Sequence, residues 1–189
     1  MLVYFEGIDG VGKSTQISLF NDDCIKTCEP GGTKLGKSLR ELIFNANATK
    51  RAEIFLFLAD RAENYEKIIK PNKNKLILSD RSFVSGLAYA MACYENYDIS
   101  ELIALNSFAL QGDFDAKFVL LLADEALLKA RLKNRGTSDS IEERGIAYLL
   151  SVQSYMQMIL KDLKFKHIIL DANADKNEIH AKIKEFILI

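Results

Sequence analysis

Nine residues near the N-terminus have the types and spacing of a loop that binds phosphate groups. They match the pattern G-x-x-x-x-G-K-[ST]. The glycines let successive backbone N–H groups turn inward on anionic oxygens. Lys13 adds a full positive charge toward the β- and γ-phosphates, and the Ser14 hydroxyl suits a ligand position on Mg²⁺. The predicted nucleotide-binding loop is Gly7, Ile8, Asp9, Gly10, Val11, Gly12, Lys13, Ser14 and Thr15.

The residues on either side of this loop supply the context that the motif needs. The run 2–5 is apolar and β-prone, which is typical of a buried parallel strand, and residues 14–20 can continue as a helix. A glycine-rich turn without a ligand is the alternative interpretation. Strand, loop and helix in this order strongly favour phosphate binding over that alternative.

Apolar β-prone runs alternate with helical patterns along the whole chain. This alternation predicts an α/β fold, a single P-loop NTPase-type domain over residues 1–189 with a five-stranded parallel sheet and helices on both faces. A small mobile lid is expected at about 134–145. Strands are predicted at 2–6, 24–28, 75–79, 117–122 and 166–170, and helices at 14–20, 34–46, 50–70, 83–95, 99–111, 124–134, 142–163 and 175–188.

Charged residues follow several of the predicted strands, where ligands of parallel sheets bind. The pair Asp80-Arg81 ends an apolar run. Its carboxylate could hold Mg²⁺ through water, and its guanidinium could bridge two phosphate groups. A structural ion pair that caps the next helix is an equally good interpretation of these two residues taken alone. The lysine-rich stretch 67–75 is expected to be a solvated connection ahead of the third strand.

Two further sets of residues could contact a nucleotide. Phe57 and Arg61 are four apart and would share one helix face, where a ring can stack on a base and a guanidinium can reach its carbonyl edge. The alternative places Phe57 in the core and leaves Arg61 exposed. Arg131 and Arg135 lie where a helix runs into a polar stretch, which indicates either a flap that brings arginine onto phosphate or a solvated helix end.

Composition bears on which partners and which cellular compartment the protein could have. The 25 Lys and Arg residues nearly balance the 26 Asp and Glu residues, so charge gives no sign of nucleic-acid or membrane binding. No apolar run is long enough to cross a bilayer. The chain has 3 cysteines without C-x-x-C spacing, which favours reduced thiols and a cytoplasmic protein. No metal site is expected beyond the one for Mg²⁺.

Together these segments resemble the thymidylate kinase family, over nearly the whole chain. Residues 5–15 are similar to its first motif, and the segment after the second strand is similar to its E-P-G-G-T motif. The resemblance implies ATP-dependent phosphorylation of dTMP to dTDP in dTTP synthesis, with Mg²⁺. The other matching segments are 57–61 (thymine-binding helix), 80–89 (D-R segment) and 135–142 (lid).

The resemblance also implies a role for individual residues. Phe57 would stack on thymine, Arg61 would bond its carbonyl edge, and Tyr89 would crowd the 2′ position. Arg40 would grip the monophosphate, Arg81 would lie between the two nucleotides, and Arg131 would contact ATP. Catalytic roles fall to Lys13, Arg81, Arg135 and Asp9, Mg²⁺ binding to Ser14 and Asp80, and dTMP binding to Asp9, Glu29, Arg40, Phe57, Arg61, Arg81, Ser85 and Tyr89.

The lid departs from the family pattern. Ser140 stands where the D-R-[IF]-E segment usually has arginine, so the expected transition-state cation is Arg135, with Arg131 and Arg144 as alternatives.

The family further implies a homodimer that contacts through its middle helices. A kinase for another nucleotide and a GTP-dependent switch remain rival functions; the second lacks the expected D-x-x-G after the loop and an N-K-x-D segment.

Overall fold

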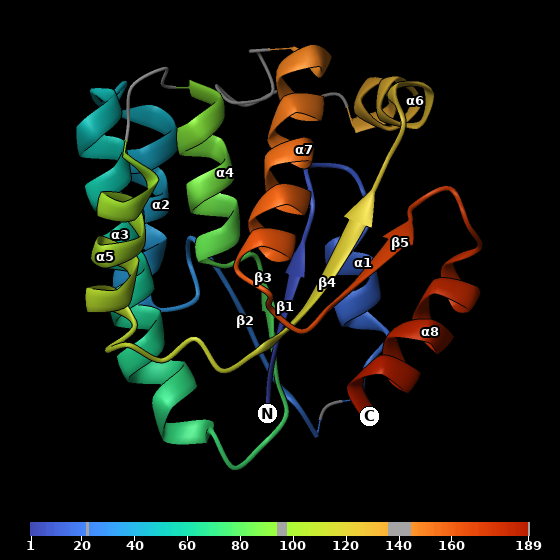
Figure 1. Cartoon of the computed structure of the whole chain (residues 1–189), viewed down its shortest axis with the longest axis horizontal. Coiled ribbons are helices and arrows are strands. Elements are labelled where there is room, and N and C mark those ends of the chain that lie inside the picture. The colour runs from blue at the N-terminus through green and yellow to red at the C-terminus, as the bar shows by residue number, and fades with distance from the viewer. Residues whose placement is uncertain (22, 94–97, 136–144, 189) are drawn as a thin grey trace.

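A five-stranded parallel sheet with helices on both faces forms the centre of the computed structural model (Figure 1). The structure describes residues 1–21, 23–93, 98–135 and 145–188, and for 132–135 the backbone alone. The spatial order is β2-β3-β1-β4-β5. The predicted fold class is confirmed, and each predicted strand lies within two residues of an observed one. The strands are β1 (Leu2–Glu6), β2 (Ile25–Cys28), β3 (Ile77–Asp80), β4 (Lys117–Leu122) and β5 (His167–Asp171).

Apolar runs place the central strands in the core. Val3 and Phe5 of β1 and Phe118 of β4 are fully buried, because helices cover both faces of the sheet. In the parallel register, Val3 lies opposite Leu78 on one side and Lys117 on the other. The central strand β1 is therefore locked on both edges just before the glycine loop that follows it.

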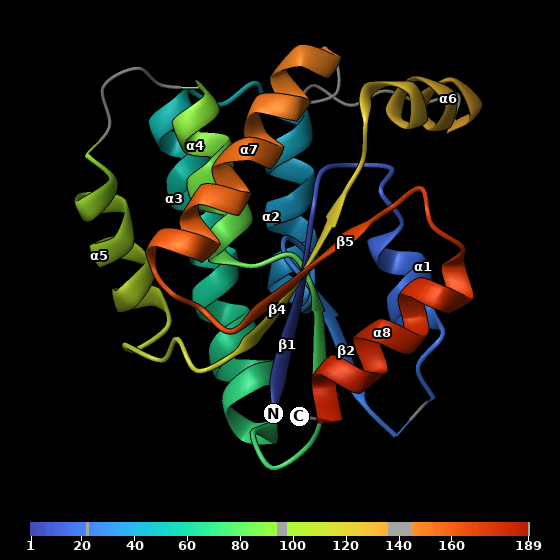
Figure 2. The same cartoon turned by 45° about the vertical axis from the view of Figure 1, so that its right-hand side comes forward.

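Helices cover the two faces unequally. Helices α1 and α8 lie against one face, and α4 and α7 lie against the other with α2, α3 and α5 beyond them (Figure 2). The helices next to the sheet bury apolar side chains against it, as in α8, where Ile179, Ile183 and Ile187 are buried. The helices are α1 (Lys13–Ser18), α2 (Lys34–Asn45), α3 (Lys50–Asn64), α4 (Phe83–Cys93), α5 (Ile99–Ala109), α6 (Glu125–Arg135), α7 (Ile146–Asp162) and α8 (Lys176–Leu188).

The segment before β3 differs from the prediction. The helix expected over 50–70 is α-helical to Asn64, continues as a π-helix over Tyr65–Ile69 and ends in a 3₁₀ turn at Lys70–Asn72. The solvated connection expected from Lys67 is therefore partly helical. Tyr65 and Ile69 are both buried, so the wider turn keeps these two apolar side chains on the core.

The carboxyl ends of all five strands meet at one edge of the sheet, at the arrowheads in Figure 1. Since β1 has β3 on one side and β4 on the other, the loops after these strands converge there, as expected for a ligand site in an open parallel sheet. The predicted lid at about 134–145 falls mostly outside the described residues. The assignment of residues 1–189 to one domain stays a prediction.

Candidate active site

The loop between β1 and α1 is folded as a compact cradle. Gly7, Gly10 and Gly12 have φ of 136°, 81° and 101°, a backbone region that side chains with a Cβ rarely adopt. A Cβ at Gly7 would lie 2.6 Å from the carbonyl oxygen of Leu121 on β4. The sequence needs glycine here because the loop rests directly on the neighbouring strand.

Lys13 is held inside this cradle. Its side chain is only 6% exposed, and Nζ donates to the carbonyl oxygens of Gly7 at 2.9 Å and Ile8 at 3.0 Å. Burial lowers the pKa of Lys13 to about 8, and the nearby charge of Arg81 acts in the same direction. An anion beside Nζ would offset both effects, so the residue is suited to bind phosphate oxygens.

Two oxygen donors meet next to the loop. The Ser14 hydroxyl donates to Oδ2 of Asp80 at 2.7 Å, which joins the start of α1 to the end of β3. Mg²⁺ at nucleotide sites takes one or two protein oxygens and completes its shell with phosphates and water. The pair therefore fits Mg²⁺. Among the described ranges, no group of three or more His, Cys, Asp or Glu residues could hold another metal.

Arg81 lies at the centre of the site and pairs with the loop. Its Nη2 is 2.9 Å from Oδ1 of Asp9, and its Nη1 donates to the Gly7 carbonyl at 3.2 Å and to Ser85 Oγ at 3.1 Å. The interpretation of Asp80-Arg81 as an ion pair that caps a helix is wrong. The first turn of α4 is instead capped by Ser82, whose Oγ accepts from the backbone N–H of residue 84.

Beside the phosphate loop, a cavity with about 570 Å³ of open space lies between α3, α4 and the loop after β2; we call it the base cavity. It contains Phe57 and Arg61, so the interpretation of Arg61 as exposed is wrong: this side chain is buried and bonded on three sides. All eight residues predicted to bind dTMP line this cavity. The lining comprises Asp9, Glu29, Pro30, Arg40, Phe44, Phe57, Arg61, Arg81, Ser82, Ser85, Gly86 and Tyr89.

Another cavity, over the phosphate loop, adjoins the base cavity; we call it the phosphate-loop cavity. It contains about 950 Å³ of open space, and four residues line both cavities: Asp9, Glu29, Arg40 and Arg81. Arg40 is tied to the loop after β2 by a 3.0 Å hydrogen bond from Nη1 to the carbonyl of Pro30. The site thus has two compartments, one lined by amides and Lys13 and one lined by aromatic rings, with two arginines where they join.

The predicted lid arginines are described only in part. Arg131 on α6 is half-buried and lies over the phosphate loop, because Nη1 donates to the Gly10 carbonyl at 2.8 Å and Nη2 to the Ala172 carbonyl at 3.0 Å. Arg135 is the last residue of α6, and its side chain lies outside the described residues, as do Ser140 and Arg144.

Comparison with known proteins decides the family. The model of the family described as thymidylate kinase matches residues 5–183. The chain belongs to the thymidylate kinase family. Proteins named thymidylate kinase from Campylobacter fetus subsp. fetus and Campylobacter hominis are 57% and 54% identical over 193 and 194 residues, with 99% of this chain and 100% of each relative covered. The structure titled as thymidylate kinase from Ehrlichia chaffeensis superposes with a TM-score of 0.73 at 26% identity, over 100% of this chain and 98% of that one.

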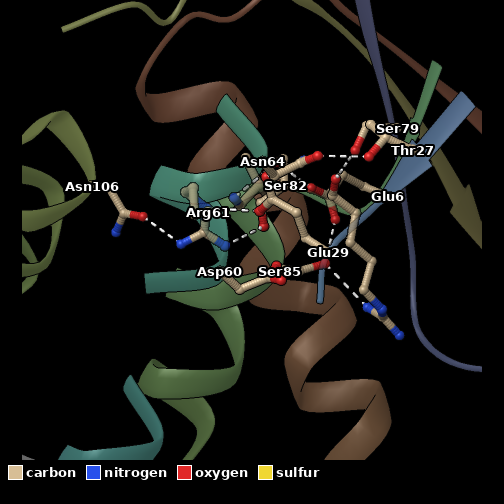
Figure 3. A network of polar contacts seen from close by, with 12 residues as sticks. Glu6, Thr27, Glu29, Asp60, Arg61, Asn64, Ser79, Ser82, Ser85 and Asn106 are labelled. Atoms are coloured by element: carbon tan, nitrogen blue, oxygen red, sulfur yellow. Dashed lines mark hydrogen bonds and ion pairs between the residues drawn. The ribbon is translucent and has the colours of Figure 1, made fainter. Parts of the chain in front are cut away.

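A polar network behind the thymidylate kinase site was missed by sequence reasoning (Figure 3). Arg61 donates to Glu29 at 2.8 Å and to Asn106 at 2.7 Å, and Asn64 donates to Glu29 at 3.2 Å. Glu6 accepts hydrogen bonds from two serines on the other side of the network. The one signal available was the presence of a charged residue such as Glu6 at the end of an otherwise apolar strand.

Proposed function

We infer that this chain transfers the γ-phosphoryl group of ATP to dTMP and forms dTDP and ADP, a step in dTTP synthesis. The observation that carries this inference is the junction of the two compartments at Asp9, Arg40 and Arg81. One compartment suits a triphosphate and the other suits a base, so two nucleotides would meet phosphate to phosphate. Membership of the thymidylate kinase family supplies the identity of both substrates.

On the ATP side, the loop amides and Lys13 would hold the β- and γ-phosphates. Ser14 and Asp80 would hold Mg²⁺, which supplies charge neutralisation between the β- and γ-phosphates when bound. Arg131 lies between the phosphate loop and Ala172, a position from which its guanidinium could turn to ATP.

On the dTMP side, Phe57 would stack on thymine and Arg61 would donate to its carbonyl edge. Three hydrogen bonds fix the Arg61 guanidinium before substrate arrives, through Nε, Nη1 and Nη2. Arg40 would bind the monophosphate at the junction, and Tyr89 would crowd the 2′ position of the sugar. Glu29 and Ser85 line the same cavity but act chiefly on Arg61 and Arg81, to which they are bonded.

The chemistry requires no nucleophile from the protein, because an oxygen of the dTMP phosphate attacks. Catalysis is then positioning together with stabilisation of negative charge on the transferred group. Arg40 and Arg81 are described cations at the junction, and Lys13 lines the adjoining phosphate-loop cavity. Arg135 is the lid arginine that we expect to join them. Asp9 would keep Arg81 aligned through their 2.9 Å ion pair.

A steady-state assay of ADP release from ATP, run with dTMP, dUMP, CMP, AMP and thymidine in turn, tests this function. We expect dTMP to give the highest kcat/KM. A preference for another acceptor would identify a different kinase, and nucleotide hydrolysis without any acceptor dependence would favour a switch or binding module. Calorimetry with an ATP analogue and dTMP should also detect a ternary complex.

The buried Lys13 predicts a pH limit for ATP use. Its pKa is lowered to about 8, so the free enzyme loses the ammonium charge as pH rises through this value. We expect kcat/KM for ATP to fall about tenfold per pH unit above this pKa. kcat/KM for dTMP at saturating ATP should lack this limb, because bound phosphates restore the pKa of Lys13. Equal pH profiles for both substrates would contradict this assignment.

We also propose that the chain forms a homodimer through its middle helices. Apolar side chains are exposed on α2, α3 and α5, among them Leu42 at 48%, Phe55 at 59% and Phe108 at 88%. Light scattering after gel filtration should give twice the chain mass. Phe55→Glu and Phe108→Glu should shift it toward the monomer, while Leu188→Glu on the distant α8 should not. A monomeric parent protein would exclude the dimer.

We place the enzyme in the cytoplasm, with no nucleic-acid or membrane partner. The three cysteines are all free thiols, which suits a reducing compartment. Within the described part of the chain, no helix combines the length and apolar character that spanning a bilayer would need. Fractionation of cells that produce the protein would test the location.

A further inference from the structure

Glu6 is a buried acid with no direct place in the site. It is the last residue of β1 and is fully buried, and it lines neither the phosphate-loop cavity nor the base cavity. The hydroxyls of Ser82 and Ser85 both donate to its carboxylate, one to each oxygen (Figure 3). A buried carboxylate without such donors would be costly, so these two bonds define its role.

Ser85 connects Glu6 to the arginine at the junction. Because the single hydroxyl proton of Ser85 is used on Glu6, its oxygen presents lone pairs elsewhere. Nη1 of Arg81 donates to that oxygen at 3.1 Å, while Nη2 of the same guanidinium pairs with Asp9. Glu6 therefore sets the direction of the hydroxyl that receives Arg81.

Ser82 connects Glu6 to the arginine of the base compartment. The Ser82 hydroxyl donates to Glu6 and accepts from the backbone N–H of Val84 at 3.0 Å, so the start of α4 is tied to β1. The carbonyl of the same Ser82 accepts from Nη2 of Arg61 at 3.2 Å. Movement of Ser82 would thus move one of the three acceptors that hold Arg61.

We propose that Glu6 is a positioning residue that orients both Arg81 and Arg61, through Ser85 and Ser82, and so aligns the acceptor nucleotide with the transferred phosphoryl group. This inference rests on the roles given above to the two arginines. It assigns Glu6 to the dTMP side of the reaction and not to ATP binding, although Glu6 directly precedes the phosphate loop.

Glu6→Gln tests the proposal because it keeps the size of the side chain and replaces one acceptor oxygen by a donor amide. The serine that meets the amide must then turn its proton away, and at Ser85 that proton would point toward the Arg81 guanidinium. We expect kcat to fall about tenfold or more and KM for dTMP to rise, since small displacements at a reacting centre are costly. The affinity for an ATP analogue, measured without dTMP, should change less than about twofold.

Gln153→Met is the matched control. Gln153 makes two hydrogen bonds with the backbone of Ala123, at 2.9 and 3.0 Å, and neither involves Arg61, Arg81 or Glu6, so their loss reports the general effect of removing internal polar contacts. We expect the control to change kcat and dTMP KM by less than about twofold. The proposal would be overturned if Gln153→Met lowered kcat as much as Glu6→Gln does. It would also be overturned if Glu6→Gln weakened the affinities for ATP and dTMP equally.

A double-mutant cycle with Ser85→Ala adds a test of the route. If Glu6 acts through Ser85, Glu6→Gln should lower kcat much less in the Ser85→Ala background than in the parent protein. Fully additive losses would contradict the proposal. If Glu6→Gln does not fold, Ser82→Ala and Ser85→Ala replace it as test variants. We expect kcat/KM for dTMP to fall in both variants. A parent-like kcat/KM for dTMP in both would overturn the proposal.

Arg81→Ala separates failure of this inference from failure of the proposed function. An inactive Arg81→Ala together with parent-like Glu6→Gln would reject the role of Glu6 alone. A fully active Arg81→Ala would instead reject the site assignment on which the role depends.

Discussion

Replacing Lys13 with alanine is expected to abolish phosphoryl transfer, with a loss of roughly 10³-fold or more in kcat/KM. Lys13 is the buried lysine of the phosphate loop itself, and its Nζ is bonded to the carbonyl oxygens of Gly7 and Ile8. Arg81 and Arg131 also contact loop carbonyls, but each has a second partner outside the loop, Ser85 for Arg81 and Ala172 for Arg131, so we do not expect either to replace Lys13. ADP release in the presence of dTMP measures the loss.

The fold should survive this substitution. Burial lowers the pKa of Lys13 to about 8, which means that the ammonium charge it still carries at neutral pH is less favourable in the native state than in the unfolded chain. We therefore expect the Tm of Lys13→Ala to equal or exceed that of the parent protein. Lys182→Ala, which removes an exposed lysine paired with Glu178, is the matched control and should keep full activity. An active Lys13→Ala variant would remove the basis of the whole functional assignment.

Arg81→Ala is expected to lower kcat by roughly 10³-fold, with a much smaller change in the affinity for dTMP. Arg81 lines both compartments, so its charge is best placed to stabilise the transferred group, whereas Arg40, Arg61 and Phe57 continue to bind the acceptor. Single-turnover kinetics with calorimetry on dTMP would separate the two effects.

The backbone at this position provides a control for Arg81→Ala. Arg81 has φ of 75°, a region that is strained for residues with a Cβ. Arg81→Gly removes the same guanidinium but relieves that strain, so it should lose the same activity with higher stability. If Arg81→Gly and Arg81→Ala differ strongly in kcat, backbone geometry and not the charge would account for the loss.

Much of the fold could be predicted because its signals are local. Apolar runs marked all five strands, and the residues that follow them in a parallel sheet must share one edge. That rule predicts that Asp9, Glu29, Asp80-Arg81 and Asp171 share this edge of the sheet. The phosphate-loop cavity contains the residues that follow β1, β2 and β3, but not Asp171. The phosphate loop carried its own fingerprint, since glycine spacing determines its backbone shape.

The polar interior could not be predicted because its partners are distant in sequence. Asn106 meets Arg61 across 45 residues, and Glu6 meets Ser82 across 76. Periodicity reports which face of a helix is buried, but it does not report which donor finds which acceptor. For the same reason, the sequence alone allowed Arg61 to be exposed, and its three hydrogen bonds exclude that alternative. The role of Arg135 remains a prediction.

The close contact between Gly7 and β4 has a consequence for how the loop behaves before ATP arrives. A loop that rests on a strand carbonyl has already lost most of its conformational entropy, so little ordering remains to oppose binding. Its backbone should therefore move little when ATP binds, and structures with and without an ATP analogue would show this. Because the contact is made by a backbone carbonyl, substitution of the Leu121 side chain should leave it in place, whereas the Cβ of Gly7→Ala should push the loop away from β4.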